Sequence, residues 1–555
     1  MRRRSRNFRT IFWFAFLIVP IYNEQMSVVR KTTDYTRKTL DSLLSNNSAF
    51  VGLLVLSFLG IGLLNILTHE MWRDELQAWL IAKDSVSIIN LFDNLRYEGH
   101  PALWHMCLYL LSRFTTPPIA MQFFHLLLAT TTIYIFTRFS PFTRLQKTLF
   151  AFGYFPLYEY AVISRNYAMG VLFIFCLCAL FRTRTKNYLF LSCILFMLAQ
   201  TSVYGLMIAI CFGTTLIMEY VFDRNLRESL SRRKTELVIG TCIFILGIVG
   251  SVYQLIPPAD SGGRIWGINI DTRRITHVIA IPWKAYIPVP EFMNTKFITS
   301  TILPSRIVAA ILSILLLCFS FLLFVRKSVV AFLYTSTTIA LLIFSYFIYF
   351  GELRHHGYLF ILFIACLWIS DYYTDTKLKS RLFNNLAGFC EKHKNKFLIG
   401  ILSIHLVLGI AASGADWFYP FSAGKETAKF IKDKQMDNML MLGDMDFPAS
   451  AVAGYLNRRI YYTQSNRFGS FIIWNNERGD HSAQEILKKA QELTLQRKED
   501  ILLVMNYELD TSSALNPIVK IKEFKKSIVP NEKYYLYLMS YDIGRTPCRV
   551  KKQPL

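Results

Sequence analysis

The chain is organised around the stretch AFVGLLVLSFLGIGLLNIL at residues 49–67 and the stretch HEMWRDE that follows at residues 69–75. The first stretch is long and apolar enough to cross a bilayer, which takes about 20 residues. The second is rich in ionisable groups, and its continuation RYEGHP at residues 96–101 adds more. A charge at the centre of a membrane helix costs roughly 2.5–3.5 kcal/mol. These groups therefore belong just past the end of the span, and we interpret the segment from His69 to Pro101 as the catalytic loop of a membrane enzyme.

The composition favours a polytopic membrane protein. Of 555 residues, 53% are hydrophobic and only 18% are charged, whereas soluble domains carry about 25% charged residues. The formal net charge of +23 would suggest a nucleic-acid partner in a soluble protein. Here most lysines and arginines lie in short loops between apolar runs, where they set the orientation of the chain in the bilayer. We therefore expect no nucleic-acid partner, and binding to anionic lipid is the alternative use of this charge.

About eleven apolar runs are predicted to span the membrane. They lie at about 49–67, 119–139, 147–162, 167–182, 188–202, 203–222, 236–256, 306–325, 328–350, 357–373 and 397–415. Every loop predicted to face the cytoplasm is basic, as the positive-inside rule requires. This orientation places the Asp74 loop on the extracytoplasmic side, and the odd number of spans places the C-terminus there too. We expect a multi-pass protein of the bacterial inner membrane with its active site on the periplasmic side.

Three segments around the first span are predicted to stay out of the membrane. Residues 1–48 form a basic cytoplasmic segment, whose apolar run at 11–22 is short and has basic residues on both sides. Residues 75–95 have apolar residues at helical spacing and predict an amphipathic helix on the membrane surface. Residues 102–114 predict a short apolar helix at the same interface.

The composition changes after residue 415, where the predicted transmembrane domain (49–415) ends. Residues 416–555 are soluble-like and predict a small extracytoplasmic α/β domain. We expect helices at 425–434 and 449–457, and strands at 438–442, 459–462, 501–505 and 534–541.

A second group of candidate residues lies at Glu159 and Arg165, between two runs that are each short for a span. The turn that joins the runs should dip into the membrane. Ions at that depth must be paired or functional. A structural ion pair between Glu159 and Arg165 is the alternative to a role in the reaction.

A third group follows in the later predicted outer loops. The loop at about 257–305 contributes Arg264 and Lys284 as substrate-contacting candidates, and a passive surface loop is the alternative. The sequence Arg354-His355-His356 lies between two spans. Arginine offers a two-pronged donor and histidine a further donor, which suits a phosphate. Ordinary anchoring at the membrane surface is the alternative.

One reaction uses these groups together. A sugar joined through phosphate to a polyprenyl lipid would place its phosphate at the outer interface, where an acceptor hydroxyl can approach. Asp74 could take the hydroxyl proton as general base, while Arg165, Arg354 and His355 stabilise the charge of the leaving phosphate. Attack opposite the leaving group would invert the anomeric carbon.

These motifs resemble the GT-C superfamily of membrane glycosyltransferases, especially the branch with the protein O-mannosyltransferases, the lipid A aminoarabinose transferases and the RgtA/B/C/D-like enzymes. The resemblance rests on Asp74-Glu75 after the first span, on Glu98-Gly99-His100-Pro101, and on Ser164-Arg165-Asn166-Tyr167. It covers residues 49–225 well and the later spans by topology. Relatives often have two prolines where this chain has Pro101-Ala102, which is a small departure.

The resemblance implies a GT-C-like helical bundle, a polyprenyl-phosphate-sugar donor and a first-loop acid as catalytic base. It transfers the base role to Asp74, with Glu75 as the alternative. The remaining candidates are Arg165, Arg354, His355 and His356 for the donor phosphate, and Glu70, Glu98, His100, Glu159, Tyr167, Arg264 and Lys284 for substrate binding. We expect no required cofactor, although the acids and histidines of the first loop leave a divalent metal possible.

Two other classes of function stay open at the level of sequence. A transporter or flippase of a lipid-linked glycan would place charges near the bilayer midplane, often within internal repeats. Here the charges gather at one face and no repeat is evident. A structural protein that kept the fold and lost activity is the other class. The sugar is not determined, and the acceptor could be a cell-envelope glycan, a lipid or a protein.

Overall fold

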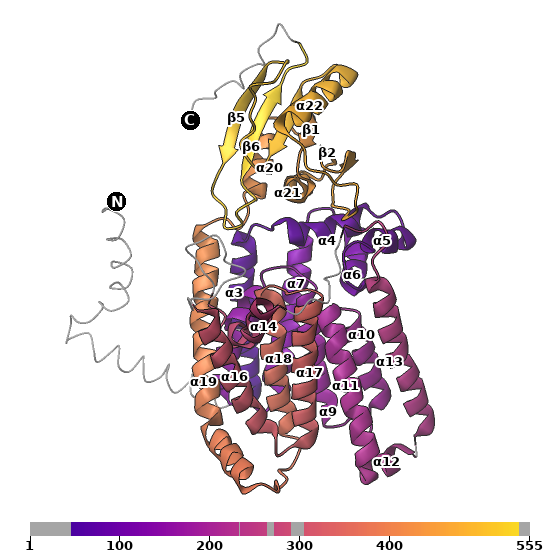
Figure 1. Cartoon of the computed structure of the whole chain (residues 1–555), viewed down its shortest axis with the longest axis vertical. Coiled ribbons are helices and arrows are strands. Elements are labelled where there is room, and N and C mark those ends of the chain that lie inside the picture. The colour runs from indigo at the N-terminus through magenta and orange to yellow at the C-terminus, as the bar shows by residue number, and fades with distance from the viewer. Residues whose placement is uncertain (1–45, 232, 263–270, 290–304, 543–555) are drawn as a thin grey trace, which may run out of the picture. The chain divides into compact units, whose positions relative to one another are not determined.

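The computed structural model describes residues 46–231, 233–262, 271–289 and 305–542 (Figure 1). The predicted cytoplasmic run at 11–22 and the candidate residue Arg264 lie outside these ranges.

Long apolar helices dominate the described part of the chain, and eight of them are long and apolar enough to cross a membrane. They are α3 (Asn47–Thr68), α7 (Ile119–Phe139), α11 (Val203–Phe222), α13 (Lys234–Leu255), α16 (Arg306–Phe324), α17 (Ser328–Phe347), α18 (Leu353–Ser370) and α19 (Arg381–Phe418). Two shorter helices, α9 (Tyr167–Phe181) and α10 (Tyr188–Ala199), coincide with two more predicted spans. At about 1.5 Å per residue, α10 rises only about 18 Å. The predicted polytopic helical fold is confirmed, with fewer full-length helices than the eleven expected spans.

The predicted span at 147–162 is not one continuous helix. The segment consists of α8 (Arg144–Ala151) and, after Gly153, the π-helix η1 (Tyr154–Glu159). Helix α19 packs against this break because Gly409 has no side chain. A Cβ at Gly409 would lie 2.7 Å from the main-chain oxygen of Phe152. Short π-helices are rare and often occur at functional sites, and η1 leads directly to the loop that contains Arg165.

The predicted surface helix at 75–95 is two helices, α4 (Arg73–Asp84) and α5 (Ile88–Leu95). The break follows from a local cap, because the Ser87 hydroxyl accepts a hydrogen bond from the main-chain N–H of Asn90 at 3.1 Å. Such an N-cap fixes the start of a new helix.

Only α5 has the exposure expected of a surface helix. Leu91 and Leu95 are buried, whereas Ile89 is 78% exposed. Helix α4 is covered by α6 (Leu103–Ser112) and by helix α21 (Asp446–Leu456) of the C-terminal domain. The residues of α4 from Glu75 to Ala82 are all buried, so the rest of the protein covers this part of the predicted surface helix.

The C-terminal domain, orange to yellow in Figure 1, is an α/β domain as predicted. Its elements are α20 (Gly424–Asp433), β1 (Leu440–Gly443), α21 (Asp446–Leu456), β2 (Ile460–Tyr462), β3 (Arg467–Gly469), α22 (Ala483–Arg497), β4 (Ile501–Met505), β5 (Ile518–Phe524) and β6 (Tyr534–Met539). Strands β3 and β5 and helix α22 are additional to the elements predicted from the sequence.

One sheet with the order β3-β2-β1-β4-β6-β5 organises this domain. Strand β1 pairs in parallel with β2 and β4, and the other pairs are antiparallel. Side chains of α20 and α21, such as Ile431 and Val452, fill one face of the sheet. Side chains of α22, such as Leu487 and Leu493, fill the other. The two-sided burial explains why β1 and β4 are continuous apolar runs.

Candidate active site

Asp74 lies in the first turn of α4, where three arginines converge on its carboxylate. Its Oδ2 is 3.1 Å from Nη2 of Arg354 and 3.7 Å from Nη1 of Arg165. Its Oδ1 is 3.7 Å from Nε of Arg73. The Asp74 side chain is 25% exposed, so a ligand can reach the carboxylate.

The charges around Asp74 control its protonation. Burial raises the pKa of the Asp74 carboxyl group, but Arg165, Arg354 and Arg73 outweigh burial and hold the pKa below its usual value. Asp74 is therefore an anion at neutral pH, the form that can accept a proton. The same guanidinium groups lower the proton affinity of Asp74 and so make it a weaker base. This effect lasts until another anion binds to the guanidinium groups.

Ser164 and Arg165 are held in place by the two adjacent acids of α4. Nη1 of Arg165 donates a hydrogen bond to the main-chain oxygen of Asp74. The main-chain N–H of Ser164 donates to Oε1 of Glu75 at 2.6 Å. Neighbouring residues on α4 thus fix neighbouring residues on the loop before α9.

Glu75 belongs to a buried network and not to the exposed side of the cluster. Its Oε2 is 2.9 Å from Nε2 of His69, and Nδ1 of His69 is 2.6 Å from Oδ2 of Asp416. Burial lowers the pKa of His69, but the charges of Asp416 and Glu75 outweigh it and raise the pKa to about 10. His69 is therefore an imidazolium that joins two carboxylates. Both oxygens of the fully buried Glu75 are engaged, which fits a supporting role better than the base role that was its predicted alternative.

His355 and Tyr167 meet beside the arginines. The main-chain N–H of Glu352 donates to Nδ1 of His355 at 2.7 Å. Nε2 therefore carries the ring proton and donates it to the Tyr167 hydroxyl oxygen at 2.7 Å. The Tyr167 O–H is then available as a donor to a ligand. The rings of His100 and Tyr167 are nearly perpendicular, with their centres 6.3 Å apart.

Several buried polar atoms at this cluster have no hydrogen-bond partner among the described residues, including Nε of Arg354, Nδ1 of His100 and Nε1 of Trp72. Burial and the nearby Arg165 and Arg354 lower the pKa of His100 to about 3, so its ring is neutral. Buried polar groups without partners are uncommon and require an explanation. A bound anion or hydroxyl group that satisfies these atoms is the explanation that fits the surrounding charges.

Glu98 is the second acid near the cluster. Its Oε1 accepts a hydrogen bond from Nε2 of Gln77 at 2.7 Å, and Gln77 also bonds to both main-chain groups of Ile472. Burial raises the pKa of Glu98 to about 7 in spite of Gln77 and Arg165. Glu98 can therefore gain or lose a proton near neutral pH.

The other candidates lie apart from Asp74. The Glu159 carboxylate accepts a hydrogen bond from Tyr154 at 2.9 Å, and its predicted ion pair with Arg165 is not present among the described contacts. Glu70 faces the C-terminal domain, where burial raises its pKa to about 7 although Lys425 lies nearby.

His356 and Lys284 both lie near Phe350 and not beside Asp74. Nε2 of His356 is 3.1 Å from the Phe350 main-chain oxygen, and Nζ of Lys284 lies 5.9 Å from the Phe350 ring centre. The structure therefore brings together Asp74, Arg165, Arg354, His355, Tyr167, Glu98 and His100 from the predicted set. Within the described ranges, no group of three or more His, Cys, Asp or Glu side chains is arranged to hold a metal ion.

Sequence reasoning missed Trp72 and Arg73. Two cations lie near the centre of the Trp72 ring, the Arg73 guanidinium at 5.1 Å and that of Arg354 at 5.5 Å. Their position beside Asp74 was the only signal available, since the partners of Arg73 lie in the C-terminal domain.

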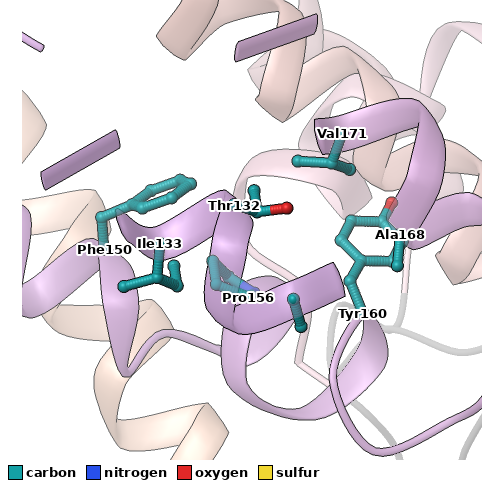
Figure 2. A pocket seen from close by; sticks show the side chains of 8 residues that line it. Thr132, Ile133, Phe150, Pro156, Tyr160, Ala168 and Val171 are labelled. Carbon is teal, nitrogen blue, oxygen red and sulfur yellow. The ribbon is translucent and has the colours of Figure 1, made fainter. Parts of the chain in front are cut away.

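A small apolar pocket, with a cavity volume of about 10 Å³, lies among α7, α8, η1 and α9. Its lining residues are Ala129, Thr132, Ile133, Phe150, Pro156, Tyr160, Ala168 and Val171. Figure 2 shows Phe150 and Tyr160 on opposite sides of it. Tyr160 connects the pocket wall to the charged cluster, because its hydroxyl donates to the main-chain oxygen of Arg354 at 2.7 Å.

Apolar helices long enough to cross a membrane, together with a C-terminal α/β domain, make up the polytopic helical fold that the sequence predicts. No protein-family model matches the sequence, and no curated protein matches it either.

Solved structures of ArnT from Cupriavidus metallidurans share this fold. The structure of ArnT bound to undecaprenyl phosphate aligns with a TM-score of 0.51 and 10% sequence identity, over 88% of this chain and 98% of ArnT. The apo structure aligns with a TM-score of 0.53 and 11% identity, over 90% of this chain and 99% of ArnT. These similarities confirm the predicted fold of a multi-pass membrane protein.

Proposed function

We propose that this protein is a membrane glycosyltransferase that moves a sugar from a polyprenyl-phosphate donor to an acceptor hydroxyl. The observation that carries the proposal is the accessible Asp74 carboxylate held between Arg165 and Arg354. The shared fold with ArnT, whose structure was solved with undecaprenyl phosphate, supports the same class of donor. This transfer requires a general base and cations that bind the phosphate close to one another, as Asp74, Arg165 and Arg354 are here.

The donor phosphate binds between Arg165 and Arg354, with the Tyr167 hydroxyl as a further donor. The buried Nε of Arg354 gains a partner in this complex. As the phosphate shares the guanidinium groups, they hold the Asp74 carboxylate less strongly and its pKa rises toward its usual value. Donor binding thus strengthens the base at the moment when it is needed.

Transfer then proceeds in one displacement. Asp74 takes the proton of the acceptor hydroxyl, whose oxygen forms a bond to the anomeric carbon. The bond from that carbon to the phosphate oxygen breaks, and the arginines stabilise the charge that the phosphate gains. Attack opposite the phosphate inverts the anomeric carbon. Because the guanidinium groups already supply positive charge, we propose that the reaction requires no metal.

The site faces the extracytoplasmic side, and the bacterial inner membrane is the proposed location. The basic residues in the loops at the opposite ends of the helices support this orientation. Acceptors of this class on that side include glycans, lipids and protein hydroxyls.

The test is sugar transfer by membranes that contain the protein and a set of polyprenyl-phosphate sugars. Asp74→Asn should reduce transfer by at least about 100-fold, in the range expected for loss of a general base, while the protein stays folded. Asp93→Asn is the matched control, because Asp93 is an exposed acid on α5 and its loss should leave transfer unchanged. Full activity of Asp74→Asn would contradict the assignment of the base.

A further inference from the structure

Arg73, which precedes Asp74, is held by the C-terminal domain. Its Nη1 donates to Oδ1 of Asn531 at 2.6 Å and lies 3.3 Å from Oε1 of Glu532. Its main-chain N–H donates to the same Glu532 oxygen at 3.1 Å. One carboxylate oxygen therefore fixes both the side chain and the backbone of the residue where α4 begins.

Glu532 is itself firmly placed. It lies in the loop between β5 and β6, and its side chain is fully buried. Its main-chain oxygen accepts a hydrogen bond from Ala423 at 3.1 Å, and its N–H donates to Val529 at 3.2 Å. Val529 in turn donates to Phe421, just beyond the end of α19. The carboxylate that holds Arg73 thus belongs to a loop that is fixed at several points.

The same domain surrounds the residues before Arg73. The Tyr455 hydroxyl donates to the main-chain oxygen of Met71 at 3.1 Å. The ring centre of Phe421 lies 5.0 Å from that of His69 and 5.9 Å from that of Trp72. The backbone that leads to Asp74 is therefore shaped by contacts with the C-terminal domain.

We propose that the C-terminal domain is an integral part of the active site and that Glu532 is a positioning residue, which fixes Asp74 through Arg73. The inference rests on the proposed function in that the position of Asp74 governs the reaction rate. A displacement of about 1 Å can lower the rate of a chemical step about 100-fold. In this role Glu532 does not take part in the chemistry itself but acts through its contacts with Arg73 at the start of α4.

Kinetics of Glu532→Gln, Arg73→Met and the double variant test this role. Each single variant should lower kcat at least about tenfold and change the KM for the donor less than about twofold. The double variant should lower kcat no further than the single ones, because residues that act as one unit are not additive. Lys83→Ala is the matched control. It removes another bond between α4 and the C-terminal domain, the 2.6 Å contact with Asn457, at the far end of the helix from Asp74, and should retain the kcat of the wild type.

Hydrogen exchange gives a readout that does not depend on activity. In Glu532→Ala, the amides of residues 70–76 should exchange at least about tenfold faster than in the wild type and in Lys83→Ala. Unchanged exchange, or a lower thermal stability with unchanged kcat, would overturn the positioning role. If the wild type transfers no sugar but exchange accelerates as expected, the proposed function fails and the coupling between the C-terminal domain and the Asp74 loop is supported.

Discussion

Two neighbouring acids, Asp74 and Glu75, have opposite environments. Consecutive residues of a helix point about 100° apart, a consequence of 3.6 residues per turn. Asp74 therefore faces Arg165 and Arg354 with a quarter of its side chain exposed, whereas the side chain of Glu75 is completely buried against His69. The sequence motif predicts that a carboxylate at residue 74 or 75 acts as the general base. The geometry indicates that a substrate can reach Asp74 and not Glu75.

The protonated His69 predicts a dependence of stability on pH. Its pKa in the folded protein is about 10 and its ordinary value is 6.5. A raised pKa stabilises the folded state fully below the ordinary value, and the stabilisation is lost as the pH rises through the pKa of the folded state. The wild type should therefore lose thermal stability between about pH 6.5 and pH 10.

The control for this prediction is His69→Gln, which cannot titrate. Thermal unfolding midpoints of detergent-purified protein, measured across this window, should converge as the pH rises, because only the wild type loses the contribution of the imidazolium. Midpoints that differ by a constant amount at every pH would show that His69 is not charged in the folded state.

At the scale of elements, the most informative difference from prediction is the break between α8 and η1. By hydropathy, residues 147–162 form one apolar run. Hydropathy carries no information on the close approach of another backbone, so it does not predict the break. Gly409 of α19 permits that approach, since a Cβ there would lie 2.7 Å from a main-chain oxygen and 3.0 Å from a main-chain carbon. Main-chain atoms cannot rotate away as a flexible side chain can.

Gly409→Ala should consequently destabilise the protein by about 1–3 kcal/mol, the usual cost of overpacking. Gly414→Ala is the matched control, because it is on the same helix and its Cβ would meet nothing within 4 Å. A lower thermal unfolding midpoint is expected for the first variant only. Equal midpoints for both variants would contradict the direct packing of α19 on the break.

The C-terminal domain shows which elements local pattern can predict. The apolar strands β1 and β4 are central in the sheet and were predicted within a few residues. Strand β5 was missed because it lies at the edge of the sheet, where Lys520 and Lys522 interrupt the apolar pattern. Edge strands often carry lysines that protect them from pairing with other chains.

At the scale of the whole molecule, the site is assembled from residues far apart in the chain. Asp74 and Arg354 are separated by 280 positions, and Arg73 and Glu532 by 459. The first pair could be predicted to share one side of the membrane, because orientation follows from charges in the loops. The sequence around Glu532 gives no signal of its proposed role, because that role depends on how the C-terminal domain folds. The chemical roles of all these residues stay predictions.

The most direct measurement of the central claim is the fate of a polyprenyl-phosphate sugar in sealed proteoliposomes with an acceptor present. The account predicts one new glycosidic bond for each polyprenyl phosphate released, with the anomeric configuration inverted. Movement of the intact lipid-linked sugar across the bilayer with no glycosidic product would contradict it and would favour a transporter or flippase.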